Sequence, residues 1–359
     1  MFTPSIEWAW RQPAGSGGQN TPGSEAATAR DSGKGRKSAA PNHSVILTRA
    51  VRGYHEGGKD STALVLIACE VADRKGFEPL IVFADTGHEH PITYDYVATV
   101  ERHVGLPIRR VRADFTEGIE RKRKFIAENW EGDGIPAERV ARALELLQPT
   151  GNPFLDMCLM KGRFPSARAR FCTEELKHFP ICRQVQLPLM KTGRVLSWQG
   201  VRADESPSRA KAKPLEQGDG RIWHFRPILS WSVGDVFELH RRHGLEPNPL
   251  YKLGFGRVGC MPCIMARKAE IGLIAARFPE EIERVREWEF LVSNTCKRGL
   301  SSFFAHDKIP GDHQGKKDIP MPQIDDVVEW SKTGKGGWNY DIESFLPVPQ
   351  CTSIYGLCE

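Results

Sequence analysis

The segment from residue 44 to residue 76 constrains the fold most strongly. "SVILTRAV" has the composition of a strand, and it leads into the glycine-rich turn "GYHEGGKDS". Beyond the turn, apolar residues recur at helical spacing, which predicts a helix that ends near Gly76. The residues that carry this spacing are Leu64, Ile67, Ala68, Val71 and Ala72.

The same alternation of strand and helix continues downstream. "PLIVFADTG" is a short apolar strand ending in a turn, residues 92–104 fit a helix, and "PIRRVRAD" fits another strand. "RVLSWQGVRADESPSR" supplies a further strand with a charged loop behind it. This order predicts an α/β fold with a doubly wound, mainly parallel sheet. Ligands bind such sheets at the carboxyl ends of the strands, where "HEGGKDS" and "ADTGHE" both lie.

The composition is that of a globular protein, with 359 residues that are 40% hydrophobic and 26% charged. We predict a disordered tail over residues 1–44, a nucleotide-binding α/β domain over 45–250, and a C-terminal region over 251–359. The C-terminal region is expected to be helical and irregular and to carry cysteines. Residues 116–148 and 266–292 fit helices, whereas the last 60 residues, rich in Gly, Pro and Asp, are expected to be irregular.

The composition gives limited information about where the protein is located and what it binds. No stretch approaches the roughly 20 apolar residues of a membrane helix, and the N-terminus lacks a secretion signal, so we expect a cytoplasmic protein with no membrane partner. The net charge of +5 permits a nucleic acid partner without arguing for one. The basic run "RKRKF" at 121–125 could contact a phosphate chain, although a solvated helix face is the simpler explanation.

The glycine turn has the parts of an anion-binding site. Backbone N–H groups of Gly57 and Gly58, the positive end of the following helix, Lys59 and Ser61 can together hold a phosphate. The spacing fits a Walker A loop as far as Lys59, but Asp60 stands where the magnesium-binding hydroxyl is required. An ordinary NTPase loop is therefore disfavoured.

The turn resembles the S-G-G-K-D-S pyrophosphate loop of the PP-loop ATP pyrophosphatase and phosphoadenylyl-sulfate (PAPS) reductase superfamily, whose fold is adenine nucleotide alpha-hydrolase-like. The matching positions are Gly57, Gly58, Lys59, Asp60 and Ser61. Glu56 replaces the first serine, and a carboxylate beside a phosphate is unfavourable unless it points away, is protonated or shares a cation.

Other segments of the chain also resemble this family. "FADTGHE" is similar to the acidic turn that holds the adenosine in this family, which implies nucleotide-binding roles for Asp85, Thr86 and Gly87. "RPILSWSVGDVFELHRRHGLEPNPLY" resembles the segment further along, in which Ser232 would cap a helix, and we expect it to be mainly structural.

"GVRADESPSR" resembles the family's G-x-R-x-x-E-S-x-x-R segment. The resemblance implies that Arg202 and Arg209 clamp phosphate or sulfate oxygens of the bound nucleotide. It also implies that Glu205 orients an arginine and that Ser206 donates a hydrogen bond.

The cysteines suggest a metal site or redox chemistry, because nine cysteines in a cytosolic chain are unlikely to form structural disulfides. Family members with a [4Fe-4S] cluster carry a Cys-Cys pair followed far downstream by C-x-x-C. Here "GCMPC" supplies Cys260 and Cys263, and Cys172 follows Phe171, which occupies the first place of the pair. Cys158 is the first candidate for the fourth ligand, with Cys182 and Cys351 behind it. A zinc site and unligated thiols are the alternatives.

The ending "CTSIYGLCE" is similar in kind, though not in residue order, to the C-terminal tail that carries a nucleophilic cysteine in the family's reductases. The resemblance implies that Cys358 attacks the substrate sulfur, with Cys351 as a resolving thiol or a cluster ligand. A tail cysteine without a role is the alternative.

These features together imply a sulfonucleotide reductase. Lys59 and Arg202 would neutralise phosphate and sulfate charge, Cys358 would take up the sulfonyl group, and a thioredoxin-like reductant would release sulfite. An ATP-dependent PP-loop sulfurtransferase that adenylates a nucleic acid, with Mg²⁺, is the main alternative. A degenerate nucleotide-binding protein without activity is another. The choice of PAPS, APS or ATP stays open.

Overall fold

The structure is a computed structural model, and it describes residues 57–305, 307–310, 321–334 and 353–357, together with the backbone of residues 43–48. The predicted tail up to residue 42 lies outside the described residues. The same holds for Glu56, Cys351 and Cys358.

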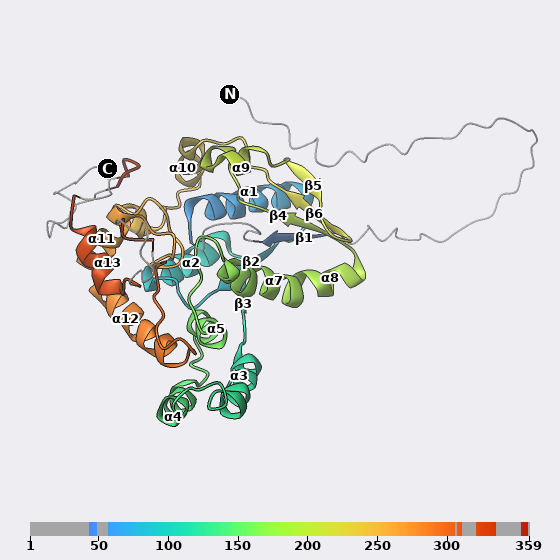
Figure 1. The fold of residues 1–359 in the computed structure, drawn as a ribbon. Coiled ribbons are helices and arrows are strands. Elements are labelled where there is room, and N and C mark those ends of the chain that lie inside the picture. Colours follow the sequence, from blue (N-terminus) through green and yellow to red (C-terminus); the bar gives the residue numbers. More distant parts are fainter. Residues whose placement is uncertain (1–42, 49–56, 306, 311–320, 335–352, 358–359) are drawn as a thin grey trace, which may run out of the picture.

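A six-stranded sheet forms the centre of the described part of the chain (Figure 1). Its spatial order is β3-β2-β1-β4-β6-β5, and every neighbouring pair is parallel except β5 and β6. The prediction of a mainly parallel α/β sheet is therefore confirmed. The strands are β1 His43–Thr48, β2 Leu80–Asp85, β3 Ile108–Arg112, β4 Arg194–Trp198, β5 Leu215–Gln217 and β6 Ile222–Phe225.

Helices cover both faces of the sheet, as expected for a doubly wound fold (Figure 1). On one face, Ile81 and Phe83 of β2 pack against three helices: α1 Lys59–Lys75, α2 Pro91–Val104 and α10 Val233–Arg242. On the other face, Val82 and Ala84 pack against the helical segment 171–192. The alternation along β2 follows from the two-residue period of a strand.

The segment 171–192 is one helical run interrupted by two π-helical turns. It consists of α6 Phe171–Thr173, η2 Glu174–His178, α7 Phe179–Ile181, η3 Cys182–Gln186 and α8 Leu187–Thr192. Each π-turn precedes a proline, Pro180 or Pro188, which has no amide hydrogen to continue the regular α-helical bonding.

A second, helical layer lies beside the sheet (Figure 1). Helices from the middle of the chain and from its C-terminal part share one hydrophobic core, in which Phe154, Trp288 and Phe303 are buried. The helices are α3 Thr116–Asn129, α4 Ala137–Leu146, α5 Pro153–Lys161, α11 Lys268–Arg277, α12 Pro279–Asn294 and α13 Ile324–Ser331. Three short elements lie in the connections: η4 Ala203–Glu205 and α9 Pro207–Ala210 between β4 and β5, and η5 Pro249–Tyr251 between α10 and α11.

The prediction of an irregular C-terminal part was wrong at α13, where Ile324, Val327 and Val328 are buried on one side of a short helix. Eight residues are too few for a periodic pattern to stand out beside glycine-rich neighbours. Strands β5 and β6 were also missed, because three or four residues with a partly polar face carry a weak signal. No helix among the described residues is both long and apolar enough to cross a bilayer.

Candidate functional site

The loop before α1 is shaped by glycine at its first described position. Gly57 has a φ of +74°, and a Cβ there would lie 2.5 Å from Thr93 Cγ2 and 3.2 Å from Asn248 Nδ2. A side chain is therefore excluded by both backbone conformation and space. Gly58 is the N-cap of α1, and its carbonyl accepts hydrogen bonds from Ser61 Oγ (2.7 Å) and Thr62 Oγ1 (3.1 Å).

Three side chains from a distant segment hold the backbone of this loop. Asn248 Nδ2 donates to the Gly57 carbonyl (3.2 Å), and Lys59 N–H donates to the Tyr251 hydroxyl (3.0 Å). His240 Nε2 donates to the Lys59 carbonyl (3.0 Å), and burial lowers the pKa of its imidazole, which favours the neutral ring. The segment expected to be mainly structural therefore fixes the shape of the anion loop.

Lys59, Asp60 and Arg202 form a buried charge cluster, with 5%, 2% and 5% of each residue exposed. Asp60 lies between the two cations: Oδ2 is 3.2 Å from Lys59 Nζ and Oδ1 is 2.6 Å from Arg202 Nε. The loop after β1 and the loop after β4 thus meet at one edge of the sheet. Lys59 and Arg202, which the sequence placed in one site, are brought together by a shared carboxylate.

The rest of the arginine loop is bonded within itself. Glu205 Oε2 accepts from Arg202 N–H (3.1 Å) and forms an ion pair with Arg209. Its orienting role stays a prediction. Ser206 was expected to donate a hydrogen bond. In the structure its Oγ accepts one from Arg209 N–H (3.3 Å) and caps α9. Arg202 also pairs with the half-exposed Asp204 (2.5 Å).

The turn after β2 places Asp85, Thr86 and Gly87 at the same edge of the sheet. Asp85 Oδ1 accepts from Gly87 N–H (2.9 Å), and its Oδ2 lies 3.0 Å from Arg112 Nε. Gly87 has a φ of +72°, and a Cβ there would lie 2.7 Å from Pro153 Cδ. Only glycine fits this close approach of the turn to α5.

A buried carboxylate that the sequence did not single out stabilises this turn. Glu89 accepts hydrogen bonds from the Thr86 hydroxyl (2.6 Å), from Thr86 N–H (3.2 Å) and from the Tyr94 hydroxyl (3.0 Å). Tyr94 also lies 2.8 Å from Asp85, and burial together with these two carboxylates raises the pKa of its phenol. The first turn of α2 links both loops, because Thr93 packs on Gly57 while Tyr94 bonds to Asp85.

His88 joins the turn after β2 to the cysteine loop "GCMPC". Its ring is fully buried and stacks on Phe154, with ring centroids 4.2 Å apart. Nε2 donates to the Pro262 carbonyl (2.7 Å) and Nδ1 accepts from Arg284 (3.3 Å), which defines the neutral tautomer. Burial, reinforced by Arg284, lowers the pKa of His88 to about 3.

We expect His88 to make stability depend on pH. Below pH 6.5 the unfolded chain protonates this histidine, whereas the folded protein takes up that proton only near pH 3, so stability falls across this window as pH falls. Lowering the pH from 6.5 to 4.5 should cost roughly 2–3 kcal/mol of unfolding free energy through this group. His88→Gln keeps a donor and an acceptor without titrating, so its urea-unfolding profile should be flatter over this range.

His103→Gln, at an exposed position on α2, is the matched control and should keep the wild-type slope. Burial raises the pKa values of Glu281 and Glu289 to about 7, so their effect on stability has the opposite pH dependence. Wild type and both variants contain these two residues, so their effect cancels in the comparison. Equal slopes in wild type and His88→Gln would contradict the assignment.

The four predicted metal ligands do not form a ligand set in the structure. Cys172 lies near enough to Cys158 and Cys263 to interact electrostatically with both. Cys158 is fully buried, and burial and Cys172 raise its pKa well above the usual range, which disfavours a thiolate. Cys260 Sγ lies 3.9 Å from Glu89 Oε1, so a thiolate there would face a carboxylate. Within the described residues, no three side chains of His, Cys, Asp or Glu are arranged to hold a metal ion.

The segment 353–357 lies against the anion loop. The Tyr355 hydroxyl donates to the Gly256 carbonyl (2.6 Å), and its ring packs on Phe237 and Tyr251, with centroids 5.2 and 5.7 Å away. Lys59 Nζ lies 5.4 Å from the centre of the Tyr355 ring and 5.6 Å from that of Tyr251. Both rings are within the range of a cation–π interaction. Residues near the end of the sequence therefore contact the predicted phosphate lysine.

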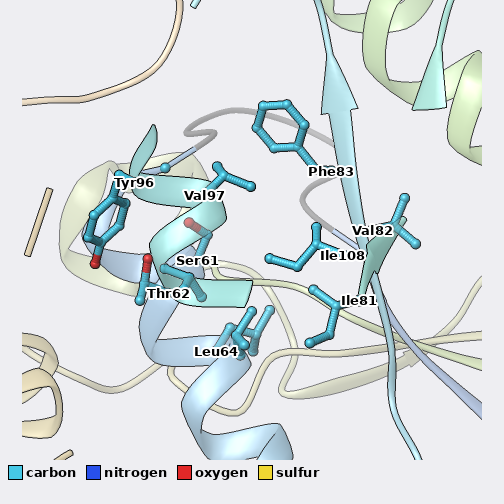
Figure 2. Close-up of a pocket in the computed structure, with 12 residues that line it drawn as sticks. Ser61, Thr62, Leu64, Ile81, Val82, Phe83, Tyr96, Val97 and Ile108 are labelled. Carbon is cyan, nitrogen blue, oxygen red and sulfur yellow. The ribbon is translucent and has the colours of Figure 1, made fainter. Parts of the chain in front are cut away.

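A cavity of about 40 Å³ lies under the loop, between α1, α2, β2 and β3 (Figure 2). Its walls are mainly apolar, and Ser61 and Thr62 direct their hydroxyls to the Gly58 carbonyl. A water needs roughly 10–15 Å³ by this measure, so the cavity has room for a few waters but not for a nucleobase. We do not place the adenine there.

The basic run at 121–125 has structural partners. Lys122 donates to the Leu159 carbonyl of α5, and Arg123 donates to the carbonyls of Leu144 and Leu147 at the end of α4 (2.6 Å to Leu147). These cations stabilise the ends of helices. The contact with nucleic acid stays an untested prediction.

The fold and this site define an α/β protein with an anion-binding loop at the carboxyl edge of a parallel sheet, the class of protein that holds nucleotides. A family model for the phosphoadenosine phosphosulfate reductase domain matches residues 54–266. The chain therefore belongs to this family, which includes adenosine 5′-phosphosulfate reductases.

Similar proteins come from phages and bacteria. An uncharacterized 37.8 kDa protein of Escherichia phage 186 is 48% identical over 84% of this chain and 95% of its own length. An uncharacterized nin-region protein of Escherichia phage lambda is 29% identical over 64% of this chain and 70% of its own length. An adenosine 5′-phosphosulfate reductase of Anoxybacillus flavithermus is 23% identical over 67% of this chain and 79% of its own length.

Proposed function

We propose that this protein is a sulfonucleotide reductase, which binds an adenylyl sulfonucleotide and releases sulfite by thiol attack on sulfur. The observation that carries the proposal is the contact of Tyr355 with Lys59, with the ring centre 5.4 Å from Nζ. It puts the segment that leads to Cys358 beside the anion loop.

Chain length supports a nucleophilic role for Cys358. Cys358 lies outside the described residues, but it is only three positions along the chain from Tyr355. Three residues span at most about 10 Å, so the thiol has a short reach to any group bound at Lys59. A nucleophile must come within about 3–3.5 Å of the atom that it attacks, and this tether supplies the required proximity.

The charged groups have distinct roles in this proposal. Lys59 and the N–H groups at the start of α1 would receive phosphate oxygens. Arg202 would face the sulfate end. Asp60, whose Oδ1 is 2.6 Å from Arg202 Nε, holds this arginine in the same cluster as Lys59. Cationic donors in a buried setting stabilise charge that builds up on the leaving phosphate. Asp85, Thr86 and Gly87 would bind the nucleoside, with Glu89 holding the turn in shape.

The reaction proceeds in two thiol steps. The Cys358 thiolate forms a bond to sulfur, the sulfur–oxygen bond to phosphate breaks, and the adenosine phosphate leaves with the electron pair. A second thiol then attacks Cys358, so that a disulfide forms and sulfite leaves. A dithiol protein of the thioredoxin class would supply the electrons, as expected in the reducing cytoplasm, where we place the protein.

No step is routed through a [4Fe-4S] cluster or zinc. Within the described residues, Cys158, Cys172, Cys260 and Cys263 are not arranged as a ligand set: Cys158 is fully buried, and Cys260 Sγ lies 3.9 Å from Glu89 Oε1.

The test is a product assay on the full-length protein with APS, PAPS or ATP, each supplied with thioredoxin and its reductase. We expect sulfite from APS or PAPS, with no pyrophosphate from ATP. Pyrophosphate release from ATP that requires RNA or DNA would replace the proposal with a sulfurtransferase. Nucleotide binding without either product would leave a nucleotide-binding protein without activity. Lys59→Met should weaken nucleotide binding in every case, because the buried cation is lost.

A further inference from the structure

We propose that Tyr251 is a further phosphate-binding residue of the anion loop: its hydroxyl accepts the N–H of Lys59 and donates its own proton to an oxygen of the bound phosphate. The inference rests on the proposed function for the presence of an adenosine phosphate at this loop, but it does not depend on the reaction at sulfur. A neutral hydroxyl would then act beside Lys59 as a separate donor to the ligand.

The direction of its hydrogen bond distinguishes Tyr251 from the other side chains that hold the loop. Asn248 and His240 donate to the carbonyls of Gly57 and Lys59, at 3.2 and 3.0 Å. Tyr251 instead accepts, because Lys59 N–H donates to its hydroxyl at 3.0 Å. A phenolic hydroxyl that accepts one hydrogen bond still has a proton to donate. The loop does not use this proton.

The hydroxyl lies where an anion would otherwise bind. Lys59 is the first residue of α1, and the N–H groups in the first turn of a helix have no carbonyl partner within the helix. Such N–H groups point out of the helix end and are the usual donors to a bound phosphate. Since the Lys59 N–H is already bonded to Tyr251, a phosphate that approaches this end of α1 meets the tyrosine hydroxyl in place of the amide.

Within the described part of the chain, the hydroxyl proton of Tyr251 has no acceptor. The bond from Lys59 N–H is the one hydrogen bond that the hydroxyl makes there. Tyr251 is fully buried, and burial raises the pKa of its phenol well above the ordinary value, so the proton is retained near neutral pH. Leaving a buried donor without an acceptor is unfavourable, and such groups in native proteins usually have a partner. A phosphate oxygen would supply that partner.

The charges around Tyr251 suit an anionic acceptor. Lys59 Nζ lies 5.6 Å from the centre of the tyrosine ring, so the backbone N–H and the side-chain ammonium of one lysine both face this residue. Arg202 belongs to the same cluster through its ion pair with Asp60 (2.6 Å). Hydrogen bonds to charged acceptors are stronger than those between neutral groups, so the hydroxyl contributes most when a phosphate is bound. In the proposed reaction it would also stabilise the charge that the leaving phosphate gains.

Equilibrium binding of adenosine 5′-monophosphate to the full-length protein tests the inference without any turnover. Tyr251→Phe keeps the ring and removes the hydroxyl, and we expect its affinity, measured by calorimetry, to fall by about tenfold. Thr93→Val is the matched control, because Thr93 is also fully buried, packs on Gly57, and has a hydroxyl without a hydrogen-bond partner among the described residues. This variant should bind the nucleotide within about twofold of wild type.

Replacing Tyr251 with 3-fluorotyrosine distinguishes a donor to the ligand from a residue that only shapes the loop. Fluorine makes the phenol more acidic, so its hydroxyl becomes a stronger donor and a weaker acceptor. If the hydroxyl donates to the phosphate, this variant should bind the nucleotide at least as tightly as wild type. If the hydroxyl only accepts from Lys59 N–H, binding should weaken, as in Tyr251→Phe. The melting temperature of each free variant measures separately what the bond to Lys59 contributes to stability.

Three outcomes would overturn the inference. They are unchanged affinity in Tyr251→Phe, equal losses of affinity in Tyr251→Phe and Thr93→Val, and weaker binding by the 3-fluorotyrosine variant. Failure of the proposed function gives a different result. Absence of sulfite in the product assay would overturn the reductase alone, because the binding of adenosine 5′-monophosphate requires no chemistry. If Lys59→Met binds this nucleotide as tightly as wild type, the loop is not the phosphate site and both proposals fall.

Discussion

Replacing Asp60 with asparagine is expected to destabilise the protein by about 3–5 kcal/mol, the cost of leaving a buried charge without its partner. Asp60 is 2% exposed and is the carboxylate that joins Lys59 to Arg202, at 3.2 and 2.6 Å. Asparagine has nearly the same shape, so packing is retained. The substitution leaves two buried cations facing each other across a neutral amide, and their repulsion adds to the lost attraction.

Chemical unfolding of wild type and Asp60→Asn at pH 7.5 measures this effect. Asp204→Asn is a matched control, because Asp204 contacts the same guanidinium at 2.5 Å but its side chain is 49% exposed. An exposed ion pair contributes at most about 1 kcal/mol, so this variant should remain close to wild type. If the two variants lose the same stability, the Lys59, Asp60 and Arg202 cluster is hydrated and its buried charges do not set the geometry of the site.

The same cluster bears on nucleotide binding. With Asp60 in place, the cluster carries one net positive charge, and an anionic ligand approaches two cations whose positions are already fixed. Added adenosine phosphates should therefore stabilise wild type by mass action, whereas Lys59→Met should show a smaller shift in melting temperature. We therefore expect anion binding and the stability of the free protein to depend on the same three side chains.

The anion loop was predictable because its constraints are local. A strand, two glycines, a lysine and an apolar helix lie within about 30 consecutive residues, and the structure shows a positive φ at Gly57 and a helix that starts at Lys59. The meeting of this loop with the arginine loop also followed, since parallel strands end at one edge of a sheet.

The groups that hold the loop were not predictable in the same way. Tyr251 bonds to Lys59 from 192 positions away, and Asn248 bonds to Gly57 from 191 positions away. Neither residue has a local pattern that marks it. Both residues end the segment that was expected to be mainly structural, but which backbone groups they reach depends on the packing of α10 against α1.

The cysteine interpretation shows a different limit. Spacing alone cannot distinguish a metal site from a dithiol, because both need two sulfur atoms within a few ångströms of each other. The groups that surround each sulfur, Glu89 beside Cys260 and Arg257 beside Cys263, are known only from the structure. Glu89 comes from a strand–turn segment 171 positions away from Cys260, so sequence inspection had no reason to pair them.

Cys358→Ser is expected to reduce sulfite formation by at least about 10⁴-fold, because a serine hydroxyl is neither ionised near neutral pH nor a good nucleophile toward sulfur. The affinity for the nucleotide should stay within about twofold, since Lys59 and the backbone of the anion loop supply the binding. Steady-state sulfite assays give the first quantity. Titration of the variant with adenosine 5′-phosphosulfate, followed by calorimetry, gives the second.

Two companion variants separate the nucleophile from its attachment. Cys69→Ser should keep full activity, because burial and Asp73 raise the pKa of the Cys69 thiol to about 11 and leave it unreactive. Tyr355→Ala removes the contact with Lys59 but keeps the thiol, so kcat should fall about tenfold or more while a slow reaction persists. Full activity of Cys358→Ser would remove Cys358 from the mechanism and make another thiol the nucleophile. Loss of nucleotide affinity in Tyr355→Ala would instead assign this ring to ligand binding, because the cation–π contact would then position Lys59 for the phosphate.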